Sequence, residues 1–220
     1  MSEILKIDTG TGGSIDTARG SIKKDPNMAK DKLLPLVNEN HDILKSPMPK
    51  FVGDLTDEFW DTLLHRMWIT MKHTGGIGLS ANQVGKPYRM FVMGNHISIA
   101  NGKKWTCINP KILKYSKETI LFKEGCLTFP FLFLPIERPK DILVEYYDEN
   151  LEKVEEGFNG IVSRCFQHES DHMEGKVFTE LVSKLKYDMA MKKRDKYIKN
   201  LAARVKDKIK DDKETGTTNT

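Results

Sequence analysis

The sequence has few cysteines and no long apolar run, and both features exclude classes of protein. No stretch approaches the ~20 apolar residues that span a bilayer, so we expect no transmembrane segment and no membrane partner. The N-terminus lacks the uninterrupted apolar stretch of a secretory signal. Three cysteines without such a signal argue against a disulfide framework. We therefore expect reduced thiols in the cytoplasm, one of which could bind a metal ion.

Nucleotide-binding motifs and a strong overall charge are also lacking. Neither Gly-x-Gly-x-x-Gly nor a Walker loop occurs, and a net charge of +4 is too small to indicate a DNA-binding protein. From Ser183 onward there are 12 basic and 6 acidic residues, whereas the first 182 residues hold 23 basic and 25 acidic ones. The basic excess therefore lies in the C-terminal tail, where it favours an acidic partner.

Composition along the chain predicts one folded domain with a polar extension at each end. Apolar residues make up 39% and charged residues 30%, which suits a single globular domain. Residues 1–32 are rich in Gly, Ser, Thr, Asp and Lys, which predicts a mobile N-terminal arm. Patterned sequence over residues 33–185 predicts the folded domain. Residues 186–220 predict a basic helical tail that ends in disorder.

Hydrophobic periodicity predicts a helix at the start of the folded region and strands after it. Asp54 to Lys72 is the first predicted helix, because Phe59, Leu63 and Met67 form one apolar stripe. Residues 88–158 contain the short apolar runs that are typical of strands, and Ile142, Val144 and Tyr146 alternate with their neighbours as strand residues do. Prolines are expected to break the runs between these strands, at positions 110, 130, 135 and 139.

The helical period returns after Gly160 and predicts a second helix. Four residues spaced four, three and four apart share one face of it: Ile161, Cys165, His168 and His172. A last helical stretch runs from Phe178 through Leu185 and Met189 into the tail. The predicted fold is α+β, with mixed or antiparallel strands packed around the helix that follows Gly160, an N-terminal helix and a C-terminal helix.

The most specific local pattern is the H-E-x-x-H sequence from His168 to His172. Two histidines at i and i+4 lie one turn apart on a helix, close enough to bind one metal ion. Glu169 between them can then act as general base on a water molecule at the metal. Taken alone, the pattern is equally compatible with an accidental sequence on a solvated helix.

Two other segments offer a third metal ligand and a substrate-binding loop. Cys126 lies 42 residues upstream of His168 at the end of a predicted strand, although a lone cysteine is more often a buried apolar thiol. The loop from Gly76 to Gln83 is built of small residues that let a substrate backbone approach. The Gln83 amide can donate a hydrogen bond to a developing oxyanion.

Together the three segments resemble the peptide deformylase family. The family motifs are G-x-G-L-A-A-x-Q, E-G-C-L-S and H-E-x-D-H, in this order and at similar separations. They stand here as Gly76 to Gln83, Glu124 to Thr128 and His168 to His172. The resemblance covers about residues 33–185 and also includes Pro130, the Arg138-Pro139 pair and Gln167.

The resemblance implies an enzyme that removes the N-formyl group from the initiator methionine of nascent polypeptides and releases formate. Three residues would bind the metal, with water as the fourth ligand: Cys126, His168 and His172. Fe²⁺ is the usual ion, and Ni²⁺, Co²⁺ or Zn²⁺ can replace it. Glu169 would take a proton from the water and pass it to the leaving amine. The metal, the Gln83 amide and the Leu127 backbone N–H would stabilise the tetrahedral intermediate.

The resemblance also implies a pocket for formyl-methionine. Its substrate-binding positions are Gly76, Ile77, Gly78, Phe122, Glu124, Gly125, Ile161 and Cys165. The methionine side chain would be received by Ile77, Phe122, Ile161 and Cys165. For Ile161, a place in the ordinary core is an equally good interpretation. Because a formyl carbon is less crowded than a peptide carbonyl, a tight loop could admit it and exclude larger acyl groups.

Some positions depart from the family pattern. Ser80 and Thr128 replace an alanine and a serine, and both are small enough to be tolerated. Leu132 and Phe133 stand where many members carry polar and basic residues, so we expect a preference for apolar residues after methionine in the substrate. Arg164 stands where apolar residues are common. It could border the pocket, but a surface salt bridge is the favoured interpretation.

Two other functions remain possible from the sequence. An H-E-x-x-H metalloprotease would need a third ligand downstream, where Glu174 and Glu180 are the near candidates. An inactive module that binds ribosomes or nascent chains would have no need of Glu169 and Gln83. The basic tail either packs on the body and is otherwise solvated, or contacts ribosomal RNA with a strong salt dependence.

Overall fold

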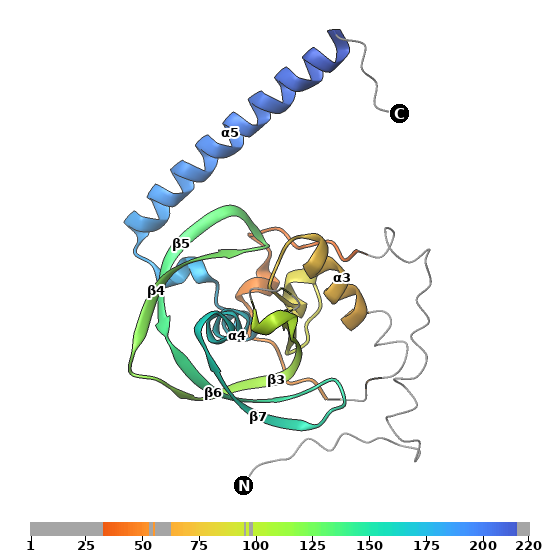
Figure 1. Ribbon diagram of the computed structural model, residues 1–220, viewed down its shortest axis with the longest axis vertical. Coiled ribbons are helices and arrows are strands. Elements are labelled where there is room, and N and C mark those ends of the chain that lie inside the picture. Colours follow the sequence, from red (N-terminus) through yellow and green to blue (C-terminus); the bar gives the residue numbers. More distant parts are fainter. Residues whose placement is uncertain (1–32, 53–54, 56–62, 95, 97–98, 215–220) are drawn as a thin grey trace.

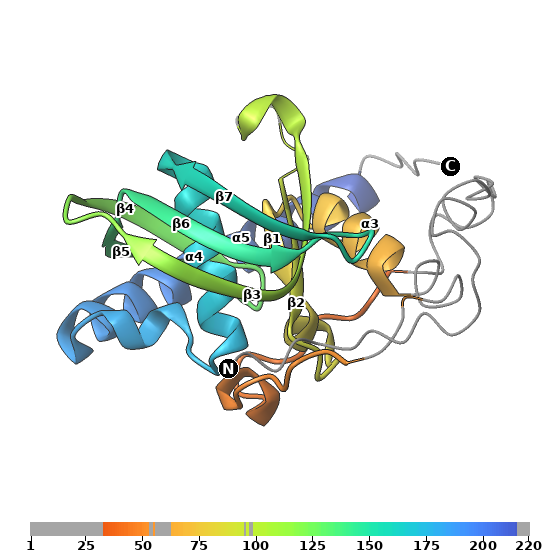
Figure 2. The ribbon, with the colours of Figure 1, turned by 90° about the horizontal axis from the view of Figure 1, so that it is seen from below.

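Two antiparallel sheets with a helix enclosed between them form the body of the molecule (Figures 1 and 2). The computed structural model describes residues 33–52, 55, 63–94, 96 and 99–214. The predicted N-terminal arm and residues 215–220 lie outside the described residues.

The larger sheet has five strands in the spatial order β1-β2-β3-β6-β7, and all neighbouring pairs are antiparallel. Its strands are β1 (Gly78–Ser80), β2 (Met90–Gly94), β3 (Lys104–Tyr115), β6 (Asp141–Tyr147) and β7 (Lys153–Asn159). The smaller sheet is a hairpin of β4 (Thr119–Cys126) and β5 (Phe129–Pro139). The α-helices are α3 (His65–His73), α4 (Gly160–Met173) and α5 (Lys184–Glu214). Short 3₁₀ segments are η2 (Asp42–Lys45), η4 (Ala81–Val84), η5 (Ala100–Gly102) and η6 (Phe178–Leu181). Helices and antiparallel strands confirm the predicted α+β class.

Strand β6 and helix α4 show how the core forms between sheet and helix. Ile142, Val144 and Tyr146 alternate along β6 and are buried. Since side chains alternate across a strand, these three face one side of the sheet. They share a hydrophobic cluster with Phe166 of α4, whose fully buried ring lies 5.1 Å from that of Phe91. This packing fixes α4 against the sheet and so positions the residues on its other face.

Helix α3 is the described part of the predicted N-terminal helix. Met67 and Met71 lie one turn apart and are both buried, as the apolar stripe predicts. The chain leaves the helix at Gly75, whose φ of 71° lies in the left-handed region that favours glycine. Residues 56–62 of the predicted helix lie outside the described residues.

The prolines do not break the strands, so that expectation is wrong. Pro110 lies within β3 at a shift in its register against β6, between Ile108 and Lys111. Such an irregularity accommodates a residue without an N–H group. Among the described strands, β5 pairs with β4 alone and has a free edge, which also tolerates proline. Its three prolines are at positions 130, 135 and 139.

Helix α5 presents a different face to the body from the one that the sequence predicts. The helical period of Phe178, Leu181, Leu185 and Met189 predicts one apolar face, but Leu185 and Met189 are 70% and 54% exposed. The chain breaks between η6 and α5, and this break resets the helical phase. The α5 side chains that pack on the body are Tyr187, Ala190 and Met191. They contact a buried cluster that we call the core cluster beneath β5, which consists of Leu44, Cys126, Phe129, Leu132, Leu134, Ile136, Val177 and Phe178.

The rest of α5 extends past β5 and away from the body (Figure 1). Arg194 pairs with Glu39 at 2.8 Å, near the last point of contact with the body. Residues 195–209 are exposed. Within the part of the chain that the structure describes, no helix is both long and apolar enough to cross a membrane.

Candidate active site

The fold brings together Cys126, His168 and His172. Strand β4 ends at Cys126, and α4 presents the two histidines one turn apart. One ligand atom of each side chain lies within 4.8 Å of the others. The Sγ atom of Cys126 is 3.4 Å from Nε2 of His172. The three predicted metal ligands are therefore close enough to share one ion.

The chemistry of this donor set fits a divalent transition metal. A thiolate with two imidazoles is a soft ligand set that suits ions such as Fe²⁺, Ni²⁺, Co²⁺ and Zn²⁺. Burial lowers the pKa of His172 well below its usual range, so its ring is in the neutral form that metals bind. Its buried Nδ1 atom lacks a hydrogen-bond partner among the described residues.

His168 differs from His172 in its protonation. Burial alone would lower its pKa, but hydrogen bonds to Cys126 and Glu124 outweigh burial and raise the pKa to about 10. Because histidine binds metals in its neutral form, we expect metal binding to release this proton.

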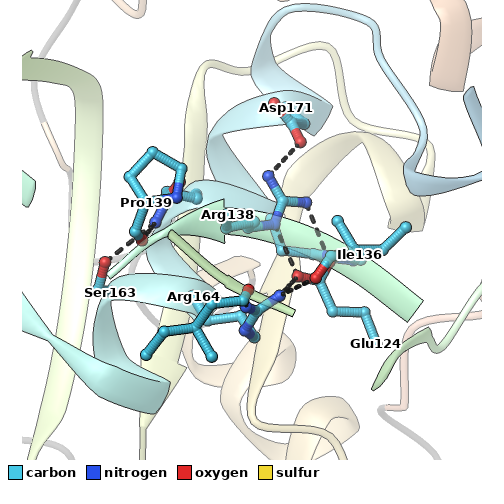
Figure 3. Close-up of polar contacts among 10 residues, drawn as sticks. Glu124, Ile136, Arg138, Pro139, Ser163, Arg164 and Asp171 are labelled. Carbon is cyan, nitrogen blue, oxygen red and sulfur yellow. Dashed lines mark hydrogen bonds and ion pairs between the residues drawn. The ribbon is translucent and has the colours of Figure 1, made fainter. Parts of the chain in front are cut away.

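Glu124 is the centre of a buried ion-pair network beside the ligands (Figure 3). Its carboxylate accepts hydrogen bonds from Arg138 at 2.7 and 3.0 Å and from Arg164, and it lies 3.1 Å from Nδ1 of His168. Arg138 also binds Asp171 at 2.8 Å. Burial opposes ionisation of Glu124, but the hydrogen bonds of His168 and Arg138 outweigh it and lower the pKa to about 2. The ionised carboxylate holds Nδ1 of His168 and leaves Nε2 of that ring available to a metal.

This network changes the interpretation of Glu124. The sequence places it among the substrate-binding residues, and it does border the cavity described below. Its carboxylate oxygens are nevertheless engaged by Arg138, Arg164 and His168. The geometry therefore indicates that Glu124 orients a metal ligand, whereas the sequence predicts a contact with substrate.

Arg164 is not a surface salt bridge, whereas the alternative that it borders the pocket agrees with its place among the residues that line the cavity described below. The side chain is buried and pairs with Glu124 (Figure 3). It also donates to the backbone oxygens of Ile136, at 3.0 Å, and Ile120. Its guanidinium lies 5.7 Å from the ring centre of Phe122. The favoured sequence interpretation is wrong because a carboxylate on β4, distant in sequence, makes burial of this charge possible.

Gln83 is held with its amide N–H toward the site. Its Oε1 accepts hydrogen bonds from the backbone N–H of Ser80 at 2.9 Å and from the Ser80 hydroxyl at 3.0 Å. Its Nε2 donates to Sγ of Cys126 and to Oγ1 of Thr128, both at 3.1 Å. Ser80 and Thr128 thus set the direction of the amide. From the sequence, both residues are expected only to be tolerated as small replacements, although their hydroxyl groups are the available signal for this role.

Glu169 on α4 is buried against Gly78 of β1. The segment that the sequence predicts as a loop is regular from Gly78 onward, because it forms β1 and then η4. Its Oε2 atom has no hydrogen-bond partner among the described residues. Burial is the largest cause that raises its pKa, to about 7. A Cβ atom on Gly78 would lie 2.3 Å from Oε1 of Glu169 and 2.9 Å from Sγ of Cys165. Only glycine at position 78 leaves room for both side chains.

One cavity of about 690 Å³ connects these groups. Gln83, Cys126, Leu127, His168 and Glu169 line it. All predicted substrate-binding residues also line it: Gly76, Ile77, Gly78, Phe122, Glu124, Gly125, Ile161 and Cys165. Ile161 is exposed and lines the cavity, so the structure favours its place in the substrate pocket over a place in the ordinary core. Leu132 and Phe133 both line the cavity, but Leu132 is buried in the core cluster beneath β5 whereas Phe133 is 61% exposed.

The C-terminal end of α4 is held by residues that the sequence analysis does not single out. Asn82 donates to the backbone oxygen of His172 at 2.9 Å, and Arg89 donates to that of Met173 at 3.2 Å. Arg89 also pairs with Glu174. These bonds satisfy carbonyl groups that a helix end leaves without partners. Asn82 lies inside the loop motif, which was the signal available for it.

Comparison with known proteins identifies the family. The sequence profile described as "Polypeptide deformylase" matches residues 33–188. The chain belongs to the polypeptide deformylase family. The peptide deformylase of Thermotoga maritima is 42% identical over 147 residues, which cover 67% of this chain and 84% of that protein. A Wolbachia peptide deformylase (subspecies Brugia malayi) is 40% identical over 143 residues, which cover 61% of this chain and 80% of that protein.

Solved deformylase structures share the fold. A crystal structure of a Synechococcus elongatus deformylase in complex with actinonin matches with a TM-score of 0.69 and 31% identity, over 76% of this chain and 88% of that one. The deformylase structure from Thermotoga maritima matches with a TM-score of 0.63 and 36% identity, over 69% and 98% of the two chains. This deformylase is a metal-dependent hydrolase that removes the N-formyl group from the initiator methionine of nascent polypeptides and releases formate.

Proposed function

We propose that Cys126, His168 and His172 hold a ferrous ion in this deformylase, and that Ni²⁺, Co²⁺ or Zn²⁺ can replace it. The observation that carries this proposal is the convergence of the three ligand atoms within 4.8 Å, beside a cavity that Cys126 and His168 line. When bound, the metal supplies a Lewis acid that polarises the formyl carbonyl and activates water. The Glu124 carboxylate keeps the His168 ring in the orientation that this site requires.

Glu169 transfers the proton in this proposal. Its carboxylate takes a proton from the attacking water and delivers it to the nitrogen of the methionine as formate leaves. A pKa of about 7 supports the assignment, because such a group accepts and donates a proton near neutral pH. Burial keeps bulk water away from the carboxylate. Its Oε2 atom has no hydrogen-bond partner among the described residues, so no other group competes for the proton there.

Gln83 and Leu127 stabilise the developing oxyanion. The Gln83 amide is aimed at the Cys126 side of the cavity by its two bonds from Ser80. Leu127 follows Cys126 in the turn between β4 and β5, so its backbone N–H lies next to the ligand in the chain. Donors fixed before the reaction stabilise charge without reorganising at the transition state.

The loop over residues 76–78 and the apolar cavity wall bind formyl-methionine. The backbone of Gly76 to Gly78 runs beside the substrate, and small residues there allow close approach. The methionine side chain occupies the part of the cavity lined by Ile77, Phe122, Ile161 and Cys165. Cys165 is held there by a 3.3 Å hydrogen bond to the Ile77 oxygen.

Residues 33–185 form the catalytic domain in this proposal, with the H-E-x-x-H helix at its centre. Residues 1–32 and 186–220 are an N-terminal arm and a basic C-terminal arm. The enzyme works in the cytoplasm, where formylated chains emerge from ribosomes. Residues 192–208 hold eight Lys and Arg and two Asp, and this charge supports a contact of α5 with ribosomal RNA.

Removal of residues 199–220 tests the ribosome contact. This cut spares Tyr187, Ala190 and Met191, which pack on the core, whereas a cut after Lys186 would also remove that packing. We expect the shortened protein to lose salt-sensitive co-sedimentation with ribosomes and to keep its activity on peptides. Undiminished co-sedimentation would overturn this part of the proposal.

Formate release tests the active site itself. Iron-loaded full-length protein is expected to release formate from formyl-Met-Ala-Ser, and Glu169→Ala is expected to lose at least about 100-fold in kcat. Cys126→Ala is expected to lose metal as well as activity, which elemental analysis of the purified protein measures. An active Glu169→Ala variant would overturn the role of Glu169, and a Cys126→Ala variant that retains metal would overturn the ligand set.

A further inference from the structure

Three phenylalanines form an exposed apolar surface beside the active-site cavity. Phe122, Phe131 and Phe133 are 56%, 47% and 61% exposed, and all three line the cavity. We call these three residues the aromatic rim. Single exposed apolar residues are ordinary, but a cluster of large ones next to a cavity marks a binding surface.

Strand β5 shows that Phe133 does not serve the core. Leu132, Leu134 and Ile136 are buried at alternate positions, so the residues between them face away from the core. Such outward positions of a hairpin with one covered face are ordinarily polar, as Glu137 is here. Phe133 departs from this pattern at a position where packing does not require an aromatic ring.

The ring of Phe133 lies next to the metal ligands. Phe133 pairs with Gly125 across the hairpin. A Cβ atom on Gly125 would lie 2.8 Å from Cε1 of Phe133, so the ring covers the backbone of Gly125. Since Gly125 immediately precedes Cys126, the exposed ring borders the cavity beside the reaction centre.

Phe131 is held at the rim by an unusual backbone conformation. Its φ is 65°, in the left-handed region that non-glycine residues rarely adopt. Its ring lies 5.2 Å from the ring of Tyr197 on α5. Strain of this kind persists where surrounding contacts impose it, and it concentrates at functional sites. Helix α5 therefore supports one side of the aromatic rim.

We propose that the aromatic rim binds the residues that follow formyl-methionine in the substrate and selects large apolar side chains there. This inference rests on the deformylase activity and on the placement of methionine proposed above. With methionine among Ile77, Phe122, Ile161 and Cys165, Phe122 borders both the methionine site and the rim, and the following residues leave the cavity across Phe131 and Phe133. An apolar side chain laid on these rings removes apolar surface of both partners from water.

Peptide kinetics test the selection. With iron-loaded full-length protein, kcat/KM for formyl-Met-Leu-Phe is expected to exceed that for formyl-Met-Ser-Asn by about tenfold. The difference should lie mainly in KM, because the rim contacts side chains that do not change during the reaction and therefore binds ground state and transition state alike.

Two variants locate the selection on the rim. Phe133→Ser is expected to reduce the ratio of the two kcat/KM values to about 2 or less, because the loss of one apolar contact is enough to remove most of a tenfold preference. Leu121→Ser is the matched control, because Leu121 lies on β4, is 63% exposed and is not among the residues that line the cavity. This control is expected to keep the parental ratio.

The outcomes separate this inference from the activity on which it rests. No formate from either peptide would overturn the activity and the inference together. Equal kcat/KM for the two peptides, or an unchanged ratio in Phe133→Ser, would overturn the inference alone. A parental protein that dimerises in sedimentation, with dimerisation abolished in Phe133→Ser and not in Leu121→Ser, would assign the rim to a second copy and also overturn it.

Discussion

Gly78 and the side chains around it set the closest approach in the active site. Glu169 and Cys165 both occupy space that a Cβ at position 78 would need. Both are buried on α4, which is fixed against the sheet by the packing of Phe166. An added methyl group therefore has to move the carboxylate of Glu169, because neither backbone can readily shift.

Gly78→Ala is expected to lower kcat for formyl-peptide by about 100-fold, as a misplacement of a catalytic group on the scale of 1 Å does. Formate release measures kcat, and thermal unfolding checks that the variant folds. Gly157→Ala is the matched control, because a Cβ there meets no atom within 4 Å. Parental kcat in Gly78→Ala would contradict the proposed contact with Glu169.

Arg164→Met tests the network around Glu124. The change removes one of the two arginines on Glu124 and the donor to the oxygens of Ile120 and Ile136. We expect the carboxylate to lose its fixed direction and the affinity for metal to fall about tenfold through His168. Competition with a chelator measures the affinity, and Arg164→Lys, which keeps the charge, should give an intermediate value. Parental affinity in Arg164→Met would show that Arg138 alone positions Glu124.

At the scale of elements, α5 is divided into a packed part and a projecting part. Its first turns cover the core cluster beneath β5, and Tyr197 contacts the aromatic rim. The projecting part carries exposed apolar residues, such as Leu201 and Val205. The two parts should therefore contribute very differently to the free energy of unfolding.

Met191→Ala is expected to lower the free energy of unfolding by about 1–2 kcal/mol, because Met191 is partly buried against the core. Val205→Ala should change it by less than about 0.5 kcal/mol, because Val205 is exposed. Urea denaturation of the two variants measures both values. Equal destabilisation by the two changes would contradict the division of α5.

At the scale of the whole molecule, the core restricts ionisation at high pH. Burial, with smaller contributions from Cys165 and Glu156, raises the pKa of Cys107 well above its usual range. Burial, with contributions from Cys107 and Glu156, also raises the pKa of Tyr146. The unfolded chain ionises these groups at about pH 8.5 and 10, whereas the folded protein keeps them neutral. The unfolded state thus binds fewer protons in alkali, and stability must fall as pH rises.

Urea denaturation from neutral pH to about pH 10.5 is expected to show this loss, with a slope of about 1.4 kcal/mol per pH unit for each ionising group. Cys107→Ala removes one of the groups, so its stability should fall less steeply above about pH 8.5. A parental stability that is constant across this range would contradict burial of the two groups as neutral species.

The sequence determined the features that depend on local spacing or on contiguous motifs. His168, Glu169 and His172 lie on one helix because residues four apart share a helical face. The short motifs around Gln83 and Cys126 contain residues that line one cavity together with His168 and Glu169. The alternation of Ile142, Val144 and Tyr146 was likewise sufficient to predict β6, since period 2 reports a one-sided strand.

Tertiary structure alone decided the features that depend on partners distant in sequence. Arg164 is buried because the fold brings the Glu124 carboxylate to it, and Pro110 remains in a strand because the register shifts there. The packed face of α5 follows from a break before Lys184 that apolar spacing does not encode. Spacing along a chain indicates which residues share an element. Charge pairing, strand edges and helix phase instead depend on which residues of other elements pack against them in the folded protein.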